Sequence, residues 1–78
     1  MRKPLHTRKN RELMAALKAA RIAAGLTQLE VARGLGRPQS FIAKLEACER
    51  RLDIIEFAEL CRVYKRSVAS MMKAIGFD

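Results

Sequence analysis

Residues 27–46, Thr-Gln-Leu-Glu-Val-Ala-Arg-Gly-Leu-Gly-Arg-Pro-Gln-Ser-Phe-Ile-Ala-Lys-Leu-Glu, decide the fold of this chain. They predict two short helices, because Gly36 separates two runs whose apolar residues recur at helical spacing. Thr27 and Glu30 form a Thr-x-x-Glu capping box at the start of the first run. Gly36 ends that helix, since a tight bend between helices needs a residue that tolerates positive φ. Two helices joined by a short turn make a helix-turn-helix unit, and an ordinary pair of core helices is the alternative.

The second helix of the pair, residues 38–46, has two chemically different faces. Phe41, Ile42 and Leu45 fall together on one apolar arc at about 100° per residue. The opposite arc carries Gln39, Ser40, Ala43 and Lys44. A short helix with a hydrogen-bonding face is suited to touching bases in the major groove of DNA.

Composition and charge favour a single small domain with a polyanionic partner. The chain has 78 residues, of which 50% are hydrophobic, and its net charge is +8. This length predicts one domain with a small core. The basic surplus indicates nucleic acid first and an anionic membrane surface second, with a merely soluble basic protein as the alternative.

Three further helices are expected around the pair. The first covers residues 10–24 and ends at Gly25. Asp53 and Glu56 form the capping box of the fourth helix, and Ser67 caps the fifth. The expected core positions on these helices are Leu13, Leu17, Ala20, Ala24, Ile54, Phe57, Leu60, Cys61, Tyr64, Val68, Met71, Met72 and Ile75. The predicted fold class is therefore all-α, a compact bundle of five short helices.

A basic arm is expected before the domain. Residues 1–9 contain four Lys and Arg residues, no acid and no periodic apolar pattern. They are interpreted as a flexible arm before a single domain at 10–78, with a solvated tail of no consequence as the alternative.

Several classes of protein and site are not expected. His6 is the one histidine in the sequence, and no nucleophile stands beside a base, so an enzyme is not predicted. Cys48 and Cys61 lack the further ligands that zinc requires, and they are interpreted as reduced thiols in the cytoplasm. No cofactor is expected. No apolar run approaches the ~18 residues that span a bilayer, although a cationic amphipathic segment at residues 2–24 is an alternative membrane-binding element.

Several spaced motifs carry a resemblance to a known family. The chain has Arg-Ile-Ala-Ala-Gly-Leu-Thr-Gln at 21–28, Leu-Gly at 35–36, Gln-Ser at 39–40 and Ile-Ala-Lys-Leu-Glu at 42–46. In this order and spacing they resemble the signature of the Xre, or lambda-repressor-like, helix-turn-helix family. The likeness continues through Arg-Arg-Leu-Asp at 50–53 and covers about residues 10–76. It implies a DNA-binding domain whose recognition helix is residues 38–46.

The resemblance assigns DNA contacts by position. Gln39 matches a residue that reads base edges, and a Gln amide fits the N6 and N7 atoms of adenine. Ser40 and Lys44 match other groove-facing positions, and Lys44 is expected to reach guanine or a phosphate. Ala43 fits against a thymine methyl group. Gln28 matches a phosphate contact at the start of the second helix.

Four more residues complete the expected DNA-contacting set. Arg37 belongs to it, and Arg50 and Arg51 are expected phosphate contacts with solvated surface as the alternative. Phe41 is included as a contact at the flank of the helix, although its apolar arc favours the core.

Arg21 and Glu46 match a family pair that forms an internal ion pair between the first and third helices. From the residues alone, Arg21 could equally face DNA, but its place beside an apolar stripe favours the structural role. Two departures accompany this match. The family usually has Gly where this chain has Cys48, and often has Gly where it has Lys65. Both sites tend to use left-handed backbone, so strain or altered caps are expected there.

These features predict sequence-specific binding to double-stranded DNA by a bacterial or phage-encoded, cytoplasmic transcriptional regulator, in particular a repressor. A homodimer on a two-fold operator is expected, with half-sites about 10 base pairs apart or a multiple of that. The fifth helix and its end supply apolar residues for the core or for a dimer face, namely Met71, Met72, Ile75 and Phe77. The alternative is an antitoxin that binds its own promoter and a toxin protein. Met14 and Ile22 are surface candidates for the toxin, with scattered surface apolar residues as the other interpretation.

Overall fold

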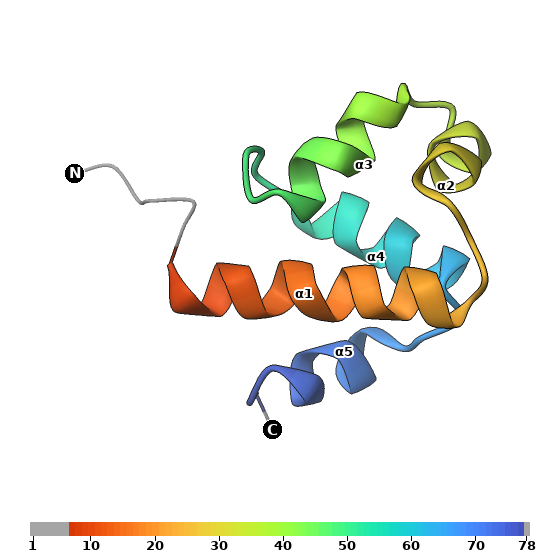
Figure 1. Ribbon diagram of the computed structural model, residues 1–78. Helices are drawn as coiled ribbons and strands as arrows, with labels where there is room; N and C mark the ends of the chain where they lie inside the picture. The colour runs from red at the N-terminus through yellow and green to blue at the C-terminus, as the bar shows by residue number, and fades with distance from the viewer. Residues whose placement is uncertain (1–6, 78) are drawn as a thin grey trace.

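A computed structural model describes residues 7–77 of the chain, and this part consists of five helices joined by short loops. The helices are α1 (Arg8–Ala23), α2 (Gln28–Leu35), α3 (Gln39–Glu46), α4 (Ile54–Val63) and α5 (Val68–Ala74). No strand occurs among these residues, so the all-α prediction is confirmed for residues 7–77. In Figure 1, α2 and α3 lie above α1, and α5 lies below it.

One core joins all five helices. α2 packs against α3, α1 contacts both α3 and α5, and α4 contacts α5. Val31 and Ala32 of α2 are completely buried, and the small Ala32 side chain lets the helix pair pack closely. Ile42, Leu60 and Met71 bring α3, α4 and α5 to the same core. Burial of such side chains is worth about 1.5–3 kcal/mol each, so this core is the main source of stability.

The first and third helices begin slightly away from their expected residues. α1 begins at Arg8, where Thr7 accepts a hydrogen bond from the backbone N–H of Asn10. Arg8 and Lys9 are therefore helical, and the expected arm of residues 1–9 is two residues too long. Residues 1–6 of that arm lie outside the described residues. α3 begins at Gln39, with Pro38 as its extended N-cap.

The buried stripe of α1 is rotated from the expected one. Met14 is 2% exposed and belongs to the core, so its assignment to a partner-binding surface is wrong. Met14, Leu17 and Arg21 are spaced by three and four residues, and this row faces the other helices. Leu13 is only partly buried, and Ala24 is exposed. The long side chains of Met14 and Arg21 reach between helices. The spacing of the Ala and Leu residues on α1, from which the stripe was predicted, gives no sign of this.

The N-terminal end of α4 also differs from expectation. Ile54 is 69% exposed, so its assignment to the core stripe is wrong, whereas Phe57 is buried. Ile54 follows the capping residue directly and lies at the rim of a surface hollow rather than under another helix. Val68 is likewise 39% exposed at the start of α5.

All five helices end in the same type of hydrogen-bonded loop. The three glycine stops, Gly25, Gly36 and Gly76, have positive φ. Cys48 and Lys65 adopt the same left-handed backbone with φ of 59° and 57°, and they are the non-glycine residues with positive φ in the described part. In each loop two backbone N–H groups bond the last turn, as Cys48 does to Leu45 at 3.0 Å. The sequence predicts strain or altered caps at these two departures from the family pattern. The cap hydrogen bonds are the same as at the glycine stops, so the caps are not altered, and the left-handed backbone of two non-glycine residues is the strained feature.

Candidate nucleic-acid interface

α3 presents its polar arc to solvent and holds the opposite arc in the core. Gln39, Ser40 and Lys44 are exposed, and Ala43 is half-buried between them and the core. Ile42 and Leu45 are 1% and 2% exposed. Because the buried arc fixes the rotation of the helix about its axis, the polar arc points outward as one surface.

An ion pair between α1 and α3 anchors the C-terminal end of α3. Arg21 Nε donates to Glu46 Oε2 at 2.7 Å, and Arg21 Nη2 donates to Glu46 Oε1 at 3.0 Å. Arg21 Nη1 also donates to the carbonyl oxygen of Leu26 at 2.8 Å. The two side chains are 11% and 7% exposed, and the hydrogen bond to Glu46 raises the pKa of Arg21. This is the pair that the sequence leads us to expect, and its geometry is bidentate and largely buried.

Gln28 links that ion pair to the start of α3. Its Nε2 donates to Glu46 Oε1 at 3.0 Å, and its Oε1 accepts from Gln39 Nε2 at 3.5 Å. The amide of Gln28 thus has an internal role in addition to the phosphate contact expected of it. Gln39 is exposed, so the rest of its amide remains accessible to solvent.

Phe41 lies in the core rather than on the exposed arc. It is 6% exposed, and the guanidinium carbons of Arg37 and Arg50 lie 4.4 and 4.6 Å from its ring centroid. Little of its ring remains accessible, so the expected DNA contact at Phe41 is not supported by its burial, and the core interpretation fits it. The two cations bind the ring face electrostatically.

Arg37 and Arg50 share a buried acidic partner. Arg37 Nη2 donates to Glu56 Oε2 at 3.1 Å, and Arg50 donates to both carboxylate oxygens at 2.9 and 3.1 Å. The hydrogen bond from Arg50 is the main cause of the lowered pKa of Glu56, and the backbone N–H of Asp53 adds to it. Arg51 is exposed, and its carbonyl oxygen accepts from Arg50 at 2.7 Å.

Glu56 is the site residue that sequence reasoning assigned only to capping. The capping box is present, because Glu56 accepts from Asp53 N–H and Asp53 accepts from Glu56 N–H. The missed role depends on side chains that lie 6 and 19 residues away along the chain. A local pattern contains no signal for the second of these contacts.

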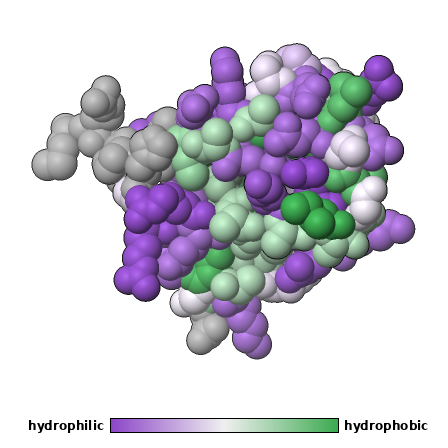
Figure 2. All heavy atoms as spheres, in the orientation of Figure 1, coloured by the Kyte–Doolittle hydropathy of each residue, from purple (hydrophilic) through white to green (hydrophobic). Residues whose placement is uncertain are grey.

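Metal-ligating clusters and membrane-spanning helices are both absent from the described part of the chain. No cluster of His, Cys, Asp or Glu able to hold a metal occurs within residues 7–77, where both cysteines are free and buried. None of the described helices is long and apolar enough to cross a bilayer. On the face in Figure 2, apolar residues gather over the C-terminal half of α1, where Ile22 is 59% exposed, and hydrophilic side chains project from the α2–α3 end.

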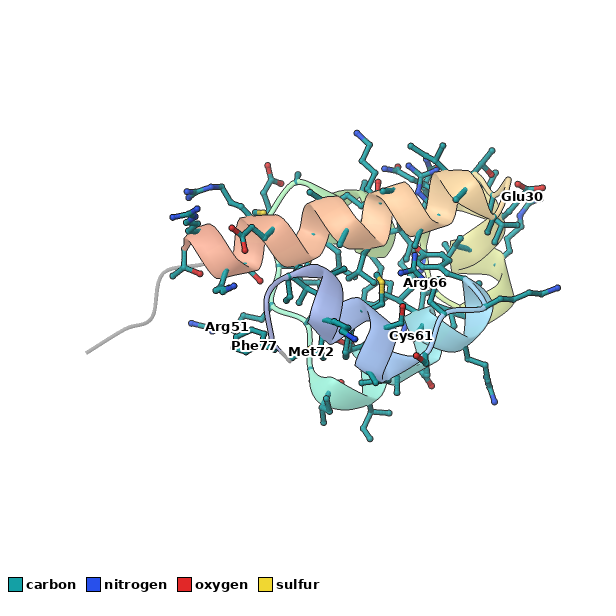
Figure 3. The ribbon with its side chains drawn as sticks, turned by 90° about the horizontal axis from the view of Figure 1, so that it is seen from below. Glu30, Arg51, Cys61, Arg66, Met72 and Phe77 are labelled. Carbon is teal, nitrogen blue, oxygen red and sulfur yellow. The ribbon has the colours of Figure 1, made fainter. Side chains whose placement is uncertain are left out.

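The apolar residues of α5 and of the segment that follows it divide between core and surface. Met71 and Ile75 are buried, whereas Met72 is half-buried and Phe77 is 50% exposed. Figure 3 shows Met72 and Phe77 at the C-terminal end of α5. The ammonium group of Lys9 lies 4.9 Å from the centroid of the Phe77 ring.

Comparison with known proteins agrees with this architecture. The sequence model of a helix-turn-helix family matches residues 17–70. Among solved structures, the chain is similar to an XRE-family like protein from Pseudomonas syringae pv. tomato str. DC3000, at 45% sequence identity and a TM-score of 0.81. That match covers 86% of this chain and 82% of the other. No match was found among curated proteins. The chain therefore belongs to the Xre-like family of helix-turn-helix proteins.

Proposed function

We propose that this protein is a sequence-specific transcriptional repressor that inserts α3 into the major groove of double-stranded DNA. Membership of the helix-turn-helix family supports DNA binding and transcription regulation in general. The observation that carries the finer proposal is the division of α3 into a buried arc and an exposed polar arc. Gln39, Ser40 and Lys44 stand on that exposed arc, on a chain of net charge +8.

Gln39 is the main base-reading residue in this proposal. Its amide offers a donor and an acceptor together, which suits bidentate binding to adenine. In the free protein the Gln39 amide lies 3.5 Å from the Gln28 amide oxygen, at the outer limit of a hydrogen bond. Lys44 reaches guanine or a phosphate, and the half-buried methyl group of Ala43 packs against thymine. Gln28, Arg37, Arg50 and Arg51 supply phosphate contacts that fix the register of the helix.

The protein acts as a homodimer on a two-fold operator in this proposal. One α3 of eight residues spans only a few base pairs, so useful specificity requires two copies. Because Met71 and Ile75 are buried, Met72 of α5 and Phe77 beyond its end are the members of the expected apolar cluster that remain for a dimer face.

Selection from a random DNA library tests the proposal directly. Rounds of binding and amplification should enrich a two-fold site whose half-sites lie about 10 base pairs apart, or a multiple of that. Gln39→Ala should lose the preference at one position of each half-site while it keeps most non-specific affinity. The matched control is Lys18→Ala, an exposed change on α1 outside the proposed interface. A library that remains unenriched for any sequence would contradict specific regulation.

An antitoxin is a second candidate, and exposed Ile22 is the observation that favours it. Ile22 lies near the C-terminal end of α1 and is 59% exposed, and a protein partner would cover such an apolar side chain. Co-expression with the neighbouring gene tests this function. A small partner that co-purifies with the wild type and is lost from Ile22→Asp would support it.

A further inference from the structure

The carboxylate of Glu56 is the centre of a compact charged cluster. Its side chain is 7% exposed, yet Arg37 and Arg50 both reach it and are themselves only 39% and 36% exposed. Both guanidinium groups also lie on the ring of Phe41, at 4.4 and 4.6 Å from the centroid. Two cations are thus held near each other by one anion and one aromatic ring.

The cluster leaves hydrogen-bonding capacity for an anion. A guanidinium group has five N–H donors in a fixed planar fork. Arg50 uses three of them on Glu56 and on the carbonyl oxygen of Arg51, and Arg37 uses one on Glu56. The remaining donors belong to partly exposed side chains. Two guanidinium groups contact the Glu56 carboxylate, and Asp53 lies near enough to Arg50 to help raise the pKa of that arginine.

The position of the cluster ties it to the recognition helix. Arg37 lies in the turn that precedes α3, Arg50 lies in the loop that follows it, and Phe41 lies in the first turn of α3 itself. A guanidinium group held in this way keeps a fixed position relative to α3. The arginines therefore bind phosphates at the same placement of the protein in which α3 contacts the bases. Fixing the side chains in advance also lowers the conformational entropy lost on binding.

We propose that Glu56 is a positioning residue, which holds Arg37 and Arg50 against Phe41 so that both guanidinium groups bind phosphates beside the recognition helix. This inference rests on the proposed DNA-binding function. It has an unusual consequence, because the negative charge of Glu56 by itself repels DNA. Simple electrostatics predicts that neutralising Glu56 strengthens DNA binding, whereas a positioning role predicts that it weakens binding.

The opposite signs allow a decisive comparison between Glu56→Gln and Glu59→Gln. Both substitutions remove one negative charge from α4, and Glu59 is exposed. Affinity for a random-sequence duplex is measured by fluorescence anisotropy over a series of salt concentrations, with the folded fraction checked by circular dichroism. Glu59→Gln should bind as tightly as the wild type or slightly more tightly. Glu56→Gln should bind roughly tenfold more weakly, and its slope of log K against log salt should fall by about 1–2.

A second background shows whether Glu56 acts through the arginines. In the Arg37→Ala/Arg50→Ala double variant, adding Glu56→Gln should no longer weaken DNA binding, because nothing remains to be positioned. A purely structural role would give the same loss in both backgrounds. Where Glu56→Gln does not fold, Arg50→Lys replaces it, since lysine keeps the charge but lacks the fork that binds Glu56 and the Arg51 carbonyl together.

The outcomes separate the inference from the function on which it rests. A folded Glu56→Gln protein, or a folded Arg50→Lys protein, that binds with wild-type affinity and an unchanged salt slope overturns the positioning role. If the wild type itself binds no duplex at low salt, the proposed function fails instead. Weaker binding that disappears in the double-variant background supports the inference.

Discussion

Replacing Arg21 with alanine should remove a large part of the folding free energy of this domain. The substitution leaves the Glu46 carboxylate, whose side chain is 7% exposed, with the amide of Gln28 as its remaining hydrogen-bond donor. It also removes the bond from Arg21 to the carbonyl oxygen of Leu26. Breaking one partner of a buried ion pair costs about 3–5 kcal/mol, because the other charge stays buried. A chain of this length has a total stability of about 4–12 kcal/mol.

Urea unfolding followed by circular dichroism measures this loss. With a slope of about 1 kcal/mol per molar urea for so small a domain, the midpoint of Arg21→Ala should fall by roughly 3 M or more. Arg33→Ala is the matched control, because Arg33 is an exposed arginine on α2. Its stability should stay within about 0.5 kcal/mol of the wild type.

A double variant separates the pair from its individual charges. Arg21→Met combined with Glu46→Leu removes both charges and keeps apolar volume, so it should recover much of the stability lost in Arg21→Ala. Equal midpoints for Arg21→Ala and Arg33→Ala would refute the structural role of Arg21. Such a result would instead favour a role of Arg21 as a cation that faces DNA, which is the alternative that the sequence leaves open.

Further expectations concern caps, titrating groups and base reading. Lys65→Gly should increase the free energy of unfolding by up to about 1 kcal/mol and so raise the thermal midpoint, because glycine adopts a backbone φ of 57° without strain. A lower midpoint would contradict this. The pKa of Glu56 is lowered by Arg50, so its contribution to stability is complete above about pH 4.5 and is lost as pH falls through the folded pKa. Glu56→Gln should therefore flatten the fall in unfolding free energy in acid, whereas an unchanged profile argues against that ion pairing. Burial raises the pKa of Tyr64 from 10.0 to about 12, so stability should decline as pH rises from about 10 to 12, and the decline should be smaller in Tyr64→Phe. Gln39→Ala should cost about 1–3 kcal/mol of discrimination at one base pair of the selected site, and retention of full sequence preference would rule out its base-reading role.

Local chemistry made the helix ends predictable. A capping box depends on residues three positions apart, so the Thr27–Glu30 and Asp53–Glu56 boxes are both found where the sequence predicts them. The C-terminal ends of the helices were predictable too, because a residue with left-handed backbone follows each helix, including Cys48 and Lys65. The family pattern identified those two positions because it records a backbone conformation rather than a side chain.

Packing between helices was less predictable. The sequence placed Met14 on the surface and Ile54 in the core, and the structure reverses both. A helical stripe fixes which residues share a face, but the extent to which neighbouring helices cover that face depends on their lengths and angles. Phe41 illustrates the same limit, because its burial depends on two arginines from loops on either side of α3.

The five helices, their caps and the polar arc of α3 follow from the sequence, because each depends on residues close together along the chain, and the net charge follows from composition alone. The family resemblance already implied the ion pair of Arg21 and Glu46, which the structure forms across 25 residues. The contact between Arg37 and Glu56 across 19 residues became visible only in the folded chain. Glu56 is a local cap in the sequence and a shared partner of two arginines in the fold, because long side chains meet only after the helices have packed.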